Sequence, residues 1–168
     1  AYTDYLQDPG ATFMPSIKTQ WKSLNCARDL SFSGRVIGGC LDTISCLTGS
    51  PFGDLNSLKD VAAKEGVIFY FENCEGRPPG VVRMIENIKQ AGWLDGVNGI
   101  LIGRSCGKDT DKKEFLSYEE ALHSTLDELN LPVLYDVDIG HSPPQMTLIN
   151  GALGTVEFSI DKEGFSKF

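Results

Sequence analysis

The sequence predicts an α/β domain built on a mostly parallel sheet. Three short apolar runs indicate its central strands, at Val67–Phe71, Gly99–Gly103 and Pro132–Tyr135. Two segments with apolar residues at helical spacing separate these runs, around Val82–Ile88 and Tyr118–Leu129. Strands that alternate with helices favour parallel pairing through right-handed crossovers, so two such crossovers define the centre of the expected sheet.

The first third of the chain leads into this sheet. Residues 1–33 are weakly patterned and punctuated by proline and glycine, and we interpret them as an interdomain connection. Within them, Trp21 and Leu24 indicate one short strand. A short apolar run at Arg35–Gly39 ends in paired glycines, so we expect a strand, a Gly-Gly turn and then a short helix over Cys40–Leu47.

The remaining elements carry clearer signals. Val67–Phe71 has five apolar or aromatic residues in succession, which is typical of a strand buried on both faces. The next helix is expected to end at Gly92. Ser117 and Glu120 have the spacing of a capping box and predict the start of the second helix. A final strand or hairpin is expected within Gly151–Ile160.

Composition and charge exclude several classes of function. The chain has 168 residues, 41% hydrophobic and 23% charged, which is ordinary for a globular domain. Its net charge of −8 argues against nucleic acid or an anionic membrane as a partner. The sequence also contains no apolar run long enough to span a membrane and no signal-peptide pattern at its start. We therefore expect a cytoplasmic protein.

The cysteines and histidines show no metal-binding pattern. No pair of cysteines has C-x-x-C spacing, and only two histidines are present. We therefore expect free thiols, no metal site and no cofactor. The cysteines are Cys26, Cys40, Cys46, Cys74 and Cys106, and the histidines are His123 and His141.

Candidate functional residues follow the ends of the three predicted strands, where sites gather in open α/β sheets. Glu72 comes directly after five apolar residues, and a carboxylate there is costly unless it is solvated or paired. It fits a catalytic acid, or a structural carboxylate that caps a helix or meets Arg83. The other strand-end candidates are Arg104, Ser105, Asp136, Asp138 and His141.

A histidine after the third strand is the candidate base. His141 lies in a loop that Gly140, Pro143 and Pro144 hold rigid. An imidazole held near a carboxylate suits a general base with a fixed tautomer, although an ordinary loop histidine is the alternative. His123 lies beside the apolar stripe of its helix and is expected at the surface.

No nucleophile stands out beside this acid and base. Gly103–Gly107 matches G-x-S-x-G with Ser105 at its centre, but no helix follows the strand directly, as that motif requires. Cys74 and Cys106 are rival candidates without a basic neighbourhood. Either the acid and base are unrelated, or the nucleophile lies elsewhere.

Several blocks of the sequence resemble, in order, the C-terminal domain of LD-carboxypeptidases, and the first two are most similar to the microcin C self-immunity branch. The blocks are Gly34–Leu41, Thr48–Pro51, Val67–Asn73, Ala91–Val97, Gly99–Gly103, and Leu131–Leu134 with Gly140 and His141.

The resemblance implies a fold and a chemistry. The fold over residues 34–168 would be a layered β/β/α domain, with a central mostly parallel sheet and a smaller second sheet. The activity would be that of a serine carboxypeptidase with a Ser-His-Glu triad, in which Glu72 and His141 match the family's Glu and His. The family's serine belongs to an N-terminal domain that this chain lacks, so the chain alone is expected to be inactive.

The resemblance also implies partners. The substrates would be L,D-linked murein peptides or microcin-like aminoacyl-nucleotides. Partners would be the missing N-terminal domain and a second copy of the chain in a homodimer. Candidate substrate-binding residues are Cys40, Asp42 and Glu75, and Cys40 stands where the family has Asn. The alternative function is that of a non-catalytic binding or interaction domain.

Overall fold

The computed structural model describes residues 19–107, 109 and 115–160. Residues 1–18 of the expected connection and 161–168 of the expected domain lie outside these ranges. The described strands are β1 (Lys22–Ser23), β2 (Asp29–Cys40), β3 (Val67–Glu72), β4 (Gly99–Gly103), β5 (Val133–Val137) and β6 (Leu153–Ser159).

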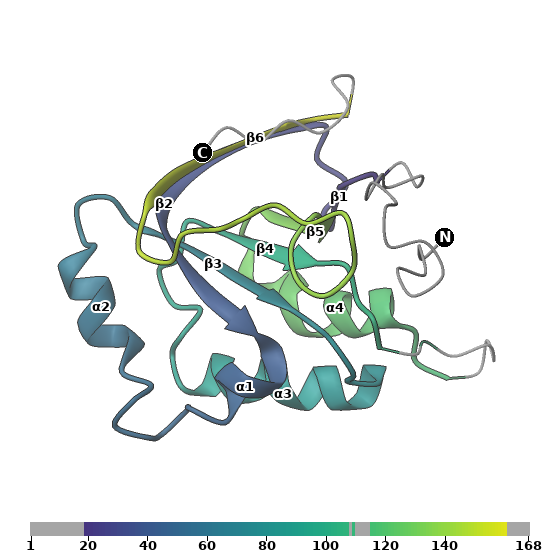
Figure 1. The fold of residues 1–168 in the computed structure, drawn as a ribbon, viewed down its shortest axis with the longest axis horizontal. Helices are drawn as coiled ribbons and strands as arrows, with labels where there is room; N and C mark the ends of the chain where they lie inside the picture. Colours follow the sequence, from purple (N-terminus) through teal and green to yellow (C-terminus); the bar gives the residue numbers. More distant parts are fainter. Residues whose placement is uncertain (1–18, 108, 110–114, 161–168) are drawn as a thin grey trace, which may run out of the picture.

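These strands form one mixed sheet in the order β1-β5-β4-β3-β2-β6 (Figure 1). The four central strands run parallel, and the edge strands β1 and β6 run antiparallel to their neighbours. The predicted α/β class with a mostly parallel sheet is confirmed. Residues 19–33, which we expected within a connection, contribute β1 and the start of β2 to this sheet.

Helices cover one face of the central strands. The described helices are α1 (Leu41–Ser45), α2 (Leu55–Val61), α3 (Pro78–Gln90) and α4 (Tyr118–Leu126), which continues into the 3-10 turn η1 (Asp127–Leu129). The apolar faces of α1, α3 and α4 share a core with β3 and β4, and Figure 1 shows these helices on one side of the sheet. Among the described residues, no helix is long and apolar enough to cross a membrane.

The opposite face of the central strands is covered by a curled part of the same sheet, formed by β6 and the first part of β2. β2 pairs with β6 over its first part and with β3 from Arg35 onward. The first part curls over the sheet (Figure 1), so that Phe32 and Val156 share a second core with Ile68 and Leu101. This gives the layered β/β/α arrangement. The strands expected in a smaller second sheet are continuous with the main sheet, because β2 belongs to both layers.

Two local predictions differ from the structure. The expected Gly-Gly turn is wrong, because β2 continues through Gly38 and Gly39 to Cys40. A Cβ at Gly38 would lie 1.7 Å from the carbonyl oxygen of Tyr70, so this glycine permits close contact between β2 and β3. Helix α2 was not predicted. It begins at an Asp54 cap, whose side chain accepts a hydrogen bond from the amide of Ser57 at 3.0 Å.

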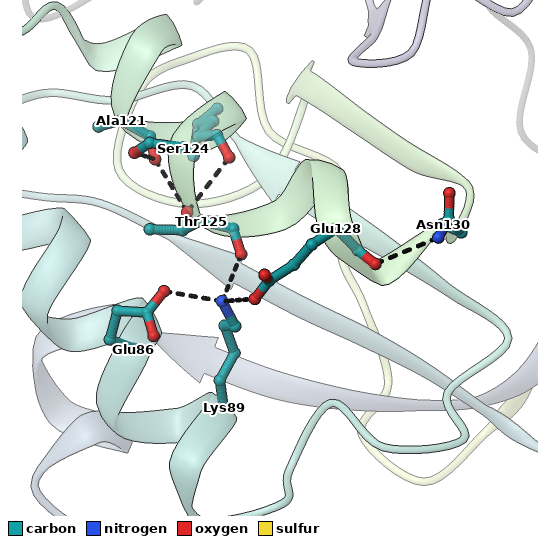
Figure 2. A network of polar contacts seen from close by, with 8 residues as sticks. Glu86, Lys89, Ala121, Ser124, Thr125, Glu128 and Asn130 are labelled. Atoms are coloured by element: carbon teal, nitrogen blue, oxygen red, sulfur yellow. Dashed lines mark hydrogen bonds and ion pairs between the residues drawn. The ribbon is translucent and has the colours of Figure 1, made fainter.

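A partly buried lysine, Lys89, joins α3 to α4 and η1 (Figure 2). Lys89 Nζ donates to Glu86 Oε1 at 2.7 Å, to the carbonyl oxygen of Thr125 at 2.8 Å and to Glu128 Oε1 at 2.6 Å. The Lys89 side chain is only 12% exposed, so these contacts lie in a partly dry environment. The network therefore fixes how the two helices pack beneath the sheet.

We expect Lys89→Ala to lower the free energy of unfolding by about 1–2 kcal/mol, because it leaves the Thr125 carbonyl without this donor. The carboxylates of Glu86 and Glu128 are more exposed and contribute less. Urea unfolding monitored by circular dichroism measures the change. Lys89→Met separates the charge from the packing of the stem, and Lys64→Ala is the exposed control. Equal stability of the Lys89→Ala variant and the parent would contradict the expectation.

Candidate active site

The candidate site lies at the carboxyl ends of the parallel strands. Glu72 is the last residue of β3, and in the parallel register it pairs with Cys40, the last residue of β2. His141 follows β5 in the loop that leads to β6. Residues that are far apart in the sequence therefore meet at one edge of the sheet, because parallel strands all end there.

Glu72 and His141 form a hydrogen-bonded pair. His141 Nδ1 lies 3.0 Å from Glu72 Oε1. The Glu72 side chain is 6% exposed and the His141 side chain 57% exposed. An ionised carboxylate only accepts hydrogen bonds, so Nδ1 carries the proton and Nε2 of the neutral ring is left as an acceptor. This is the orientation that a general base requires.

Two glycines make room for the buried carboxylate. A Cβ at Gly103 would lie 2.7 Å from Glu72 Cβ, and a Cβ at Gly140 would lie 2.5 Å from Glu72 Cγ. Gly140 also has a φ of +96°, which disfavours other residues. Within the described residues, Glu72 Oε2 is buried and has no hydrogen-bond partner. Gly103 and Gly140 therefore form a glycine cradle around a carboxylate that has one oxygen without a hydrogen bond in the described part of the chain.

The three predicted substrate-binding residues lie at different places around this pair. Cys40 is closest, since its Sγ, a carboxylate oxygen of Glu72 and a ring nitrogen of His141 all lie within 4.8 Å of one another. Burial raises the pKa of the Cys40 thiol, and the carboxylates of Asp42 and Glu72 raise it further. The hydrogen bond from that thiol lowers the pKa of the exposed Asp42 carboxyl. Glu75 is exposed.

An arginine that was only one of several strand-end candidates holds the His141 loop. Arg104 forms an ion pair with Asp138. Its Nη2 also donates to the carbonyl oxygens of Ser142 at 2.7 Å and Pro144 at 2.5 Å, two residues that follow His141 in the chain. Asp138 further accepts from Trp21 Nε1 at 3.0 Å, so it braces the loop instead of contacting the imidazole. Its position directly after β4 was the only sequence signal for Arg104.

The remaining strand-end candidates take structural positions. Ser105 Oγ accepts from Asn73 Nδ2 at 2.7 Å and from the amide of Gly107 at 3.1 Å, so it ties two loops together. Among the described residues no hydrogen bond joins Ser105 to His141. Asp136 forms an ion pair with Lys22 at 2.9 Å.

The candidate thiols of Cys106 and Cys74, and the second histidine, His123, are not part of the Glu72–His141 pair. Cys106 Sγ lies 2.9 Å from Ser142 Oγ. Burial raises the pKa of the Cys74 thiol, which disfavours a reactive thiolate. His123 is partly exposed on α4 and its Nδ1 lies 3.0 Å from Asp127 Oδ1, one helical turn away.

We expect His141 to titrate above the ordinary histidine pKa, first because of its hydrogen bond to Glu72 and then because of the charge on that carboxylate. A pKa that is higher in the folded than in the unfolded state stabilises the fold at low pH. This contribution is complete below the unfolded value of about 6.5 and is lost as the pH rises through the folded value.

Proton NMR of the imidazole in metal-free buffer measures this pKa, and a His123→Gln variant assigns the signal. Glu72→Gln should lower the pKa of His141 toward its ordinary value. A pKa that is unchanged by this substitution would show that the pair is not coupled.

Residues 33–156 match the family model of the LD-carboxypeptidase C-terminal domain. The chain belongs to the LD-carboxypeptidase family. This confirms the family that the sequence motifs indicated. The match includes every residue of the Glu72–His141 pair, the glycine cradle and the Arg104 brace.

Curated relatives of this LD-carboxypeptidase chain include a microcin self-immunity protein and a murein peptide carboxypeptidase. The microcin C7 self-immunity protein MccF of Escherichia coli is 28% identical over 125 residues, covering 74% of this chain and 34% of MccF. A probable murein peptide carboxypeptidase of Bacillus subtilis is 26% identical over 121 residues, covering 71% of this chain and 35% of that protein.

The structure of muramoyltetrapeptide carboxypeptidase from Oxalobacter formigenes has the same fold. It superposes with a TM-score of 0.63 and 22% identity, covering 90% of this chain and 49% of that one. The present LD-carboxypeptidase chain spans less than half the length of the curated relatives it matches.

Proposed function

We propose that this chain supplies the base and the orienting acid of a serine-type amide hydrolase. One observation carries the proposal: the 3.0 Å hydrogen bond between a buried carboxylate, Glu72, and an exposed imidazole, His141. A merely structural pair in a binding domain has no need for an exposed ring with a free acceptor nitrogen. The geometry therefore favours catalysis over the alternative of a non-catalytic domain.

In the first half of the reaction, a serine hydroxyl from another domain of the complete protein attacks the carbonyl carbon of the substrate amide. His141 Nε2 takes the hydroxyl proton as the new C–O bond forms. The buried carboxylate of Glu72 keeps Nδ1 protonated and stabilises the imidazolium. His141 then gives its proton to the leaving nitrogen, the C–N bond breaks and an acyl-enzyme remains.

In the second half, water replaces the amine. His141 accepts a proton from that water as it attacks the acyl carbon, and then returns the proton to the serine oxygen as the ester bond breaks. The products are a free carboxylic acid and an amine, and the residues return to their starting protonation states. The glycine cradle and the Arg104 brace keep His141 in one place through both steps.

For the substrate, we propose a murein-type peptide or an aminoacyl-nucleotide of the microcin type. The names of the B. subtilis and E. coli relatives support these two classes. The exposed carboxylates of Asp42 and Glu75 both raise the pKa of His141 and so lie close enough to affect a ligand there. They favour a substrate that presents an ammonium group or other hydrogen-bond donors.

The test uses the chain with and without a nucleophile domain. Alone, the 168-residue chain should release no amine from a murein tetrapeptide or an aminoacyl-sulfamoyl nucleotide. Fused to the N-terminal domain of a relative, it should hydrolyse one of them, and the fusion with His141→Ala should not. Hydrolysis by the isolated chain that disappears in a Ser105→Ala variant would overturn the split-triad proposal.

A further inference from the structure

Three side chains with metal-binding atoms converge at the strand ends, although the sequence shows no metal-binding spacing. Cys40 ends β2, Glu72 ends β3 and His141 lies in the loop after β5. Their ligand atoms lie within 4.8 Å of one another. A thiol, a carboxylate and an imidazole are the three kinds of ligand that zinc takes in proteins, and three protein ligands leave a fourth position open.

We propose that Cys40, Glu72 and His141 form a binding site for Zn²⁺ or a similar borderline-soft divalent ion. Zinc–ligand bonds of about 2.0–2.3 Å place tetrahedral ligand atoms roughly 3.5 Å apart. Ligand atoms that lie as far apart as the 4.8 Å limit must therefore move about 1 Å closer together when the ion binds. The exposed imidazole of His141 makes this movement by rotation about its own side-chain bonds, without displacing the braced loop, whereas Glu72 is held by its glycine cradle.

The buried carboxylate gives an independent reason for a cation here. Glu72 Oε2 has no hydrogen-bond partner within the described part of the chain, and the side chain is 6% exposed. An uncompensated oxygen in such a place costs free energy that a bound cation recovers. Metal binding displaces the proton of the Cys40 thiol, and the resulting thiolate, a carboxylate and a neutral imidazole carry two negative charges, which balance one divalent ion. The nearby Asp42 and Glu75 add an attractive field.

Cys40 decides the selectivity of the site. Without it, only one carboxylate and one imidazole remain, which is too few ligands to hold zinc firmly. The thiolate also selects zinc over magnesium, which prefers oxygen ligands. A family member with the usual asparagine at this position would lack the third ligand. The site is therefore expected to depend on the cysteine that distinguishes this chain from the family pattern.

Isothermal titration calorimetry of the reduced 168-residue chain with ZnCl₂ tests the proposal directly and does not depend on the nucleophile domain. We expect one zinc ion per chain and no binding of MgCl₂. Substitution by Co²⁺ should give the near-ultraviolet absorption of a thiolate-to-cobalt bond. Cys40→Asn should weaken zinc binding by about 100-fold or more. Cys46→Ser is the matched control, because Cys46 is exposed at the end of α1 and lies outside the ligand cluster.

Cys40→Ser serves as a second variant of nearly unchanged size, and circular dichroism verifies that each variant is folded. If the parent chain binds no zinc, or if folded Cys40→Asn and Cys40→Ser variants bind it as tightly as the parent, the proposal is overturned. A cobalt spectrum without a thiolate band has the same consequence. Each of these results bears on metal binding alone, because the proposed hydrolysis is argued from the hydrogen bond between Glu72 and His141 and not from a metal.

Discussion

The Glu72→Gln substitution is expected to lower kcat by about 10⁴-fold in a protein that joins this chain to a nucleophile domain. Glutamine preserves the size of the side chain and fits between the same glycines. It removes the negative charge that stabilises the His141 imidazolium. Its amide also offers a donor to Nδ1, which favours the tautomer in which Nε2 carries the proton and cannot accept one.

Steady-state kinetics on a murein tetrapeptide or an aminoacyl-sulfamoyl nucleotide measure this effect, with KM expected to change little because Glu72 is buried beneath the imidazole. Glu157→Gln is the control, since it removes one carboxylate from an exposed position on β6. A Glu72→Gln enzyme within tenfold of the parent kcat would refute the role of Glu72 as the orienting acid.

The Gly140→Ala substitution is expected to damage both stability and activity. Its Cβ would lie 2.5 Å from Glu72 Cγ and 2.8 Å from Glu72 Oε2, so the carboxylate or the His141 loop must move. Left-handed backbone adds about 1–2 kcal/mol for a residue with a Cβ, and overpacking adds about 1–3 kcal/mol. We expect a loss of roughly 2–5 kcal/mol in the free energy of unfolding.

The same displacement should lower kcat/KM by about 100-fold, because a misplacement of about 1 Å has this effect on a catalytic group. Gly151→Ala is the matched control: Gly151 also has a positive φ, of +84°, but a Cβ there would meet nothing within 4 Å. It should lose only about 1–2 kcal/mol and keep its activity. Equal effects of the two substitutions would show that backbone strain alone, and not the cradle around Glu72, explains the result.

The Glu72→Gln and Gly140→Ala predictions both test the buried carboxylate, the first through its charge and the second through the space around it. Glu72 supplies the charge of the buried carboxylate, and Gly103 and Gly140 leave room for it. Gly103 is the last residue of β4, and Gly140 lies in the loop after β5. Neither glycine touches a reacting atom. In the proposed mechanism they act by positioning Glu72, which in turn orients His141.

Much of this protein could be predicted from the sequence because the signals are local. The run Val67–Phe71 consists of five apolar or aromatic residues, which predicted a strand covered on both faces, with Glu72 directly after it. Ser117 and Glu120 predicted a helix start because a capping box needs only four residues, and both of its hydrogen bonds are present. The family motifs likewise follow the chain in order.

Features that depend on packing could not be predicted in this way. Gly38 and Gly39 suggest a turn when only their neighbours along the chain are considered, but contact with Tyr70 makes them part of a strand. Asp138 is nearer to His141 in sequence than Glu72 is, yet Asp138 pairs with Arg104, and Glu72 is the residue that hydrogen-bonds to the imidazole.

By itself, the sequence determined that this is an α/β chain of the LD-carboxypeptidase family, with Glu72 and His141 following the ends of parallel strands. Only the tertiary structure decided that Glu72 meets His141, that glycines enclose the Glu72 carboxylate, and that Cys40 lies beside the pair. The reason is physical: strand and helix formation depends on neighbours along the chain, whereas a site depends on distances set by crossovers between strands.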